Sequence, residues 1–135
     1  MTKSIDENQL IDFISSYSGD FKPSTVKGMA QYFHQSITTI HDNVVTHYDN
    51  PESFVDHLVG ALKPLVETGF SHSILDEIKV HPLREHSHCV SASFNRLTKE
   101  GELLQKVGAS YIVISTDSGF KIAAIMGQDI DNIIK

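Results

Sequence analysis

The chain changes the period of its hydrophobic pattern at Phe70, and this change restricts the possible folds more than any other feature. Before Gly69, apolar residues recur every three or four positions in three segments, 6–17, 24–35 and 50–69, which predicts three helices that each bury one face. After Phe70, apolar and polar residues alternate in four segments, which predicts strands. Helices followed by an antiparallel meander of strands are typical of the α+β class.

The expected buried faces of the helices follow from these spacings. The first helix is expected to bury Leu10, Ile11, Phe13, Ile14 and Tyr17, and the second Val26, Met29, Ala30 and Phe33. Asn50 as cap and Pro51 as first residue begin the third helix, and Gly69 ends it. Its expected buried face contains Phe54, Leu58, Ala61, Leu62 and Leu65, widened by Val55, Val59 and Val66.

Strand signals occur in both halves of the chain. Residues 36–40 and 44–48 favour strands and flank the turn signal Asp42-Asn43, which predicts a short hairpin. Gly108 is expected to mark a bulge in a strand over 103–116. Two further strand faces are expected, one of Ile74, Asp76, Ile78 and Val80, and one of Val90, Ala92 and Phe94. The small, lightly polar face opposite the latter, Cys89, Ser91, Ser93 and Asn95, suits a close contact between two sheets of a dimer.

Length, charge and cysteine content exclude several classes of protein. A chain of 135 residues fits one domain with a single core and leaves no room for a separate cofactor domain. Its net charge of −6 opposes binding to nucleic acid or to an anionic membrane, and no apolar run approaches the ~18 residues of a membrane span. Because Cys89 is the only cysteine and the N-terminus is too polar for a secretory signal, we expect a cytoplasmic protein without an internal disulfide.

Five short segments, taken in their order and spacing along the chain, form a recognisable pattern. They are Tyr32-Phe33 before the hairpin, Asn50-Pro51-Glu52-Ser53-Phe54 opening the third helix, Thr68-Gly69-Phe70 closing it, Phe94-Asn95-Arg96 before the Gly101 turn, and Ser118-Gly119-Phe120-Lys121-Ile122 opening the last strand. Together they resemble the nuclear transport factor 2-like superfamily, which includes ketosteroid isomerases and SnoaL-like polyketide cyclases. The resemblance implies one cystatin-like domain over residues 1–135. Its cone-shaped, curved antiparallel sheet would wrap around the three helices, with a pocket at the open end and homodimers formed through the sheet.

The resemblance also implies a place for a catalytic base. In ketosteroid isomerases a catalytic aspartate ends the strand that follows the second helix, and His41-Asp42 occupies this place. A base there would move a proton between carbons beside a carbonyl. Family members often have proline next, whereas this chain has Asn43, and Asp-Asn is also common turn chemistry. Asp42 is therefore either a general base or a turn residue.

Five residues are candidates for ligand contact. Tyr17, Tyr32 and His57 lie at the edges of apolar helical stripes, and the resemblance points such positions into the cone. The alternative for these three is an ordinary place at the edge of the core. Arg96 shares a strand face with Phe94, and it either anchors a ligand carboxylate in the pocket or emerges into solvent.

Histidine is frequent, with eight residues in the chain, and His86 and His88 lie two apart. On a strand these two would share a face, and His81 with Glu85 or Asp76 would complete a metal site. The alternative is an exposed strand start. Because no other ligand pattern supports a metal, we predict none.

These observations predict a domain that binds a small apolar or carbonyl-bearing molecule without a cofactor. The sequence lacks the phosphate-loop, dinucleotide, nucleophile-elbow and zinc-protease motifs. Two alternatives stay open. One is a cofactor-independent isomerase, dehydratase or cyclase with Asp42 or His41 as general base. The other is an interaction module that binds a partner protein through its sheet.

Overall fold

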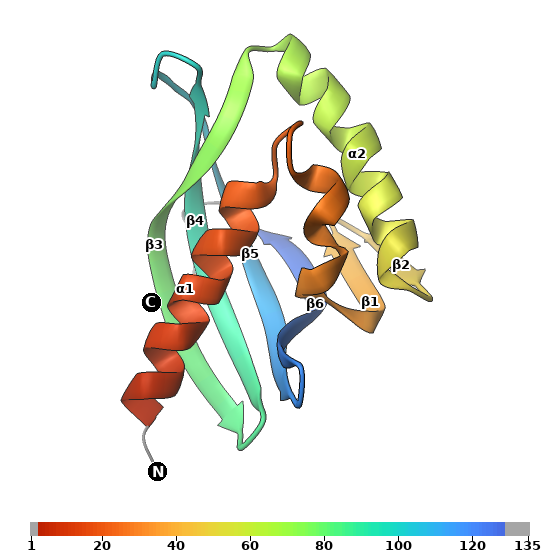
Figure 1. The fold of residues 1–135 in the computed structure, drawn as a ribbon, viewed down its shortest axis with the longest axis vertical. Helices are drawn as coiled ribbons and strands as arrows, with labels where there is room; N and C mark the ends of the chain where they lie inside the picture. The colour runs from red at the N-terminus through yellow and green to blue at the C-terminus, as the bar shows by residue number, and fades with distance from the viewer. Residues whose placement is uncertain (1–2, 129–135) are drawn as a thin grey trace.

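The computed structural model describes residues 3–128 (Figure 1). Three helical elements and a hairpin form the first half: α1 (Lys3–Asp20), the 3-10 helix η1 (Val26–Tyr32), β1 (Phe33–His41), β2 (Val44–Tyr48) and α2 (Pro51–Glu67). Four strands form the second half: β3 (Phe70–Arg84), β4 (Ser87–Thr98), β5 (Leu103–Thr116) and β6 (Gly119–Gln128). The predicted α+β class, with helices before a meander, is confirmed.

The strands form one six-stranded sheet in the order β2-β1-β6-β5-β4-β3. Neighbours pair antiparallel except for β1 and β6, which run parallel. The expected antiparallel sheet is observed at every described pairing except that of β1 with β6. No hairpin joins β1 to β6, because β2, α2 and three strands lie between them in the chain, so no turn forces the two strands to run in opposite directions.

The curved, unclosed sheet wraps around the three helical elements. Figure 1 shows α1 in front of β3 and β4, η1 beside it, and α2 at the outer edge near β1 and β2. The core lies between these helices and the sheet. Its fully buried apolar side chains are Leu10, Ile14, Met29, Ile37, Val90, Ala92, Val113 and Ile122.

The second helical segment differs from its prediction. It is a 3-10 helix that ends at Tyr32, whereas the sequence predicted a helix as far as Gln35. Its buried residues, Val26, Met29 and Tyr32, recur every three positions, which is the period of a 3-10 helix. Phe33 is already extended, with φ −111° and ψ 145°, because it pairs with Ile122 of β6.

The ends of α2 are as predicted. Asn50 caps the helix by accepting a hydrogen bond from the Ser53 amide at 2.8 Å, and Gly69 follows it with φ +101°. The buried face is narrower than predicted, because Ala61 and Val66 are exposed. Since α2 lies at the edge of the fold, only one side of it meets η1 and the sheet.

Two features of the strands differ from their predictions. The register of β3 against β4 shifts between Leu75 and Glu77, so Leu75 packs against the core while Ile74 is 51% exposed. The predicted common face of Ile74, Asp76, Ile78 and Val80 is therefore wrong. Gly108 marks no bulge, since it pairs in register with Ser93.

Within residues 3–128, no helix combines the length and the hydropathy that crossing a bilayer requires.

Candidate functional site

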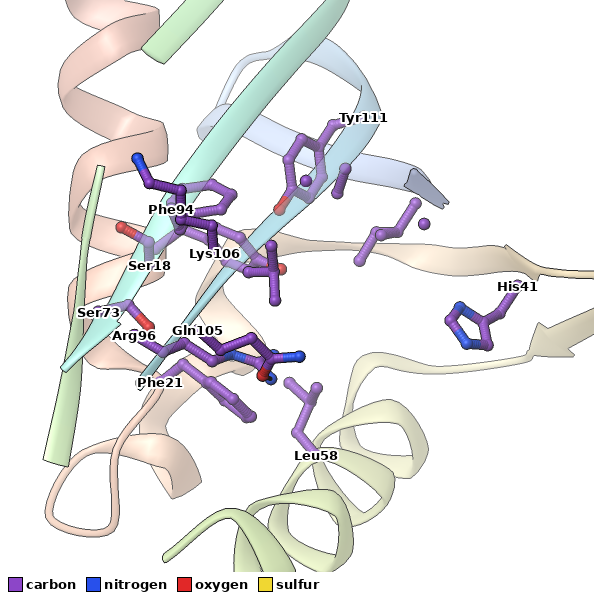
Figure 2. Close-up of a pocket in the computed structure, with 16 residues that line it drawn as sticks. Ser18, Phe21, His41, Leu58, Ser73, Phe94, Arg96, Gln105, Lys106 and Tyr111 are labelled. Carbon is purple, nitrogen blue, oxygen red and sulfur yellow. Dashed lines mark hydrogen bonds between the residues drawn. The ribbon is translucent and has the colours of Figure 1, made fainter. Parts of the chain in front are cut away.

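A cavity of about 510 Å³ lies between the helices and the inner face of the sheet (Figure 2). Its wall contains Tyr17 and Phe21 from α1 and the segment after it, Leu58 from α2, and Phe94 and Tyr111 from β4 and β5. Cavities that bind small organic molecules commonly have volumes of about 300–1,000 Å³ and mostly apolar walls with a few polar groups. This cavity has both properties.

Two tyrosines form one side of the wall. Tyr17 follows Leu10 and Ile14 on the buried face of α1, and Tyr111 alternates with Val113 on the inner face of β5. Their ring centroids lie 5.4 Å apart with planes at 79°, an edge-to-face contact.

Burial raises the pKa of both tyrosines. For Tyr17, a hydrogen bond with Tyr111 and the positive charge of Arg96 oppose this rise. For Tyr111, burial together with the charge of Tyr17 and the hydrogen bond to it raises the pKa well above the usual range, and only Arg96 opposes this. Both hydroxyls therefore keep their protons at neutral pH. Because Tyr111 uses its proton in the bond to Tyr17, the pair offers one O–H donor, that of Tyr17, to a ligand oxygen.

Arg96 supplies the positive charge of the cavity. It lies two residues after Phe94 on the inner face of β4, opposite Gln105 of β5, and its Nη1 donates a hydrogen bond to the Gln105 Oε1 at 3.2 Å. Burial lowers the pKa of Arg96, and the nearby Tyr17 and Tyr111 oppose this. A guanidinium keeps its charge even so.

His41 forms the opposite side of the cavity. Figure 2 shows its ring far across the cavity from Phe94 and Arg96, at the end of β1. The ring lies over Gly127 of β6, where an added Cβ would come within 2.7 Å of the His41 Nδ1. The imidazole can lie there because Gly127 has no side chain.

Four of the seven predicted site residues line the cavity: Tyr17, His41, Phe94 and Arg96. Asp42 does not. It occupies the β1–β2 turn with φ +54°, and its side chain is 88% exposed. This is the position of a turn residue, and the geometry gives no support to Asp42 as a general base.

Tyr32 and His57 also lie outside the cavity wall. The Tyr32 hydroxyl donates a hydrogen bond to the Asp20 carboxylate, and its ring packs edge to face against Phe13 and Tyr17. His57 lies on the exposed side of α2 and stacks on Phe54 with the ring planes at 16°. Both have the structural roles that the sequence left open as alternatives.

The histidines near the β3–β4 turn do not share a face. His86 belongs to the turn before β4 and is exposed, whereas His88 faces the core beside Phe120. His81 pairs with Cys89, on the opposite face from His88. In the part of the chain that the structure describes, no group of three or more His, Cys, Asp or Glu side chains could hold a metal ion.

Sequence reasoning missed Tyr111 and Gln105. Tyr111 was detectable, because it alternates with Ala109 and Val113 in a predicted strand. Gln105 was not, because its role depends on the register that places it opposite Arg96.

Solved structures with the same fold share little sequence with this chain. A protein of unknown function with a cystatin-like fold from Nostoc punctiforme superposes with a TM-score of 0.72 at 6% identity, over 91% of this chain and 90% of that one. A candidate dehydratase of the NTF2-like family from Streptomyces avermitilis has a TM-score of 0.70 at 13% identity, with 96% and 99% covered. A candidate scytalone dehydratase from Novosphingobium aromaticivorans has a TM-score of 0.70 at 11% identity, with 99% and 87% covered.

At these identities the likeness shows the fold alone. The search of curated proteins found no match to the sequence. A family model described as NTF2-like protein (DUF6841) matches residues 6–130, nearly the whole chain, and the chain therefore belongs to this NTF2-like family.

Proposed function

We propose that the cavity binds a small organic molecule through an oxygen atom that accepts a hydrogen bond from the Tyr17–Tyr111 hydroxyl pair. The observation that carries the proposal is the pair of buried, protonated hydroxyls at one wall of a cavity of about 510 Å³. A buried hydroxyl is an effective donor, because no water competes for the bond once a ligand fills the site.

The remaining wall suits an apolar ligand body. Phe21, Leu58, Phe94, Val107 and Ile125 contribute hydrocarbon surface. Burying ligand carbon there is favourable by about 25 cal/mol for each Å² removed from water. A carbonyl-bearing or similarly oxygenated molecule would bond to the tyrosine hydroxyls through its oxygen and would bury its apolar remainder against the hydrocarbon side chains. A cytoplasmic location belongs to the same proposal, since the single Cys89 requires no oxidising compartment.

A second candidate function is proton transfer at carbon, as in a cofactor-independent isomerase, dehydratase or cyclase. His41 favours it, because it is the only imidazole on the cavity wall among the described residues, and that part of the wall contains no carboxylate. In such a reaction His41 would exchange a proton with a ligand carbon on its own side of the cavity. In a conjugated ligand the negative charge would then move to a carbonyl oxygen on the other side, where the Tyr17–Tyr111 pair would stabilise it. The candidate dehydratases of similar fold are consistent with this chemistry.

Screening with small ketones and phenols by NMR tests the binding function. Tyrosine-labelled protein provides the readout, because Tyr17 and Tyr111 line the cavity whereas Tyr48 does not. We expect bound compounds to shift the resonances of Tyr17 and Tyr111 and to leave Tyr48 unchanged. Equal shifts at Tyr48, or no shifts with any compound, would overturn the proposal.

A further inference from the structure

We propose that the ligand of this cavity carries a carboxylate and that Arg96 binds it. This inference deepens the proposed function and rests on it. It assigns the ligand to one chemical class, an organic acid with a single negative charge and an apolar body.

The first support is the environment of Arg96. Its side chain is half-buried on the inner face of β4, and a guanidinium has five N–H donors. One of them bonds the neutral Gln105 side chain at 3.2 Å. Among residues 3–128, no carboxylate lies within 4.0 Å of Arg96 to form an ion pair. A partly desolvated charge without a counter-ion is unfavourable, and a ligand carboxylate would remove that penalty.

The second support is the charge of the rest of the wall. The protein as a whole carries a net charge of −6, yet none of the described wall residues is Asp or Glu. Lys106, which also borders the cavity, directs its ammonium to Asp76 at 3.2 Å. Among the described wall residues, Arg96 is therefore the permanently charged cation that stays available to a ligand, and an anion entering the cavity meets no opposing carboxylate on this wall.

The third support is the match between the donors and a carboxylate. A guanidinium binds both oxygens of a carboxylate through two parallel hydrogen bonds. The Tyr17 and Tyr111 hydroxyls belong to the same cavity as Arg96, so the pair can bond an anion that the guanidinium holds there. The single positive charge of Arg96 balances one negative charge and leaves a phosphate dianion only half neutralised. The geometry thus favours a monocarboxylate.

A matched pair of probes tests the inference. 4-Phenylbutyrate and 4-phenylbutanamide have nearly the same shape, but only the acid is charged at neutral pH. We expect calorimetry to show that wild-type protein binds the acid at least about tenfold more tightly than the amide. In Arg96→Gln we expect this preference to disappear. Arg84→Gln removes the only other arginine, which is exposed and outside the cavity, and it should keep the preference.

The possible outcomes separate the two proposals. Equal binding of acid and amide by wild-type protein overturns the carboxylate assignment and leaves the binding function standing. Loss of the preference in both arginine variants would show a general charge effect and would also overturn it. If neither probe binds, the carboxylate assignment fails for arylalkanoates, and the screen with neutral compounds decides separately on the binding function. The wild-type comparison needs no variant, so misfolding of Arg96→Gln cannot leave the inference undecided.

Discussion

Tyr17 of α1 and Tyr111 of β5 meet edge to face, with ring centroids 5.4 Å apart. This contact joins the first helix to the centre of the sheet, and the same two residues form a wall of the cavity. The packing that holds α1 on the sheet therefore also fixes the hydroxyl pair that we propose to bond the ligand. Removing one hydroxyl while keeping its ring separates the two roles.

Tyr111→Phe should weaken ligand binding and leave the fold intact. The ring contact with Tyr17 remains, whereas the Tyr111 hydroxyl is lost together with its hydrogen bond to Tyr17. One such bond corresponds to about 0.5–1.5 kcal/mol, or about 2- to 10-fold in affinity where it supports the ligand. Calorimetry with 4-phenylbutyrate measures the affinity, and urea unfolding measures the stability. Tyr48→Phe, outside the cavity, is the control and should bind as wild type does. Unchanged affinity in Tyr111→Phe would contradict the proposed role of the hydroxyl.

Tyr32 should make the fold sensitive to alkaline pH. Burial, the hydrogen bond to Asp20 and the charge of Asp20 raise the pKa of Tyr32 from 10.0 to about 12. Because the pKa of Tyr32 is higher in the folded state than in the unfolded state, protonated Tyr32 stabilises the fold. This stabilisation is fully present below pH 10 and is lost as the pH rises from 10 to about 12.

The variant Tyr32→Phe tests whether Tyr32 causes this loss of stability at alkaline pH. The variant lacks the hydrogen bond to the Asp20 carboxylate, so its free energy of unfolding at pH 7 should fall by about 1–2 kcal/mol. Its further loss between pH 10 and 12 should be smaller than that of wild type, with Tyr17 and Tyr111 accounting for the remainder. Urea unfolding across this range gives both values, and an identical loss in the two proteins would refute the assignment.

Gly127→Ala should move the His41 ring without unfolding the sheet. The new Cβ would meet the His41 Nδ1 at 2.7 Å, but the His41 side chain is 82% exposed and is free to turn away. We expect altered His41 ring resonances by NMR and a change in stability below about 1 kcal/mol. Gly60→Ala, where an added Cβ meets nothing within 4 Å, should leave His41 unchanged. His41 signals that stay the same in Gly127→Ala would rule out the close approach.

We also propose that two copies associate through the face of the sheet that points away from the helices. Ile74 lies on this face opposite Asn95 and is 51% exposed. Light scattering should give a mass twice that of the 15.0 kDa chain, and Ile74→Lys should shift it towards the monomer. Leu103→Lys, at a residue of similar exposure (55%), is the control. A monomeric wild-type protein would disprove the dimer and would leave this face open to another partner.

Local signals in the sequence predicted the two ends of α2 correctly. The Asn50 cap and Gly69 at the end of α2 depend on a few adjacent residues, and both were recognisable without a structure. Tyr17, Phe94 and Arg96 line the cavity, and each could be placed at its edge from the sequence because it lies on a regular apolar face. Their contact with a ligand stays a prediction.

Features that depend on pairing between distant segments were not predictable. The bulge between Leu75 and Glu77 changes which residues face inward, and no glycine marks it. The parallel pairing of β1 with β6 joins strands from opposite ends of the chain. The contact of Arg96 with Gln105 likewise depends on the register between β4 and β5. The sequence does not give this register, so Gln105 could not be placed beside Arg96 without the structure.

The crystal structure of the protein soaked with 4-phenylbutyrate tests the central claim most directly. The account predicts ligand density inside the cavity, with the carboxylate at Arg96, one of its oxygen atoms within hydrogen-bonding distance of the Tyr17–Tyr111 hydroxyl pair, and the phenyl ring against Phe94. Density only on the outer surface, or a cavity closed by the rings of Phe21 and Phe94, would contradict it.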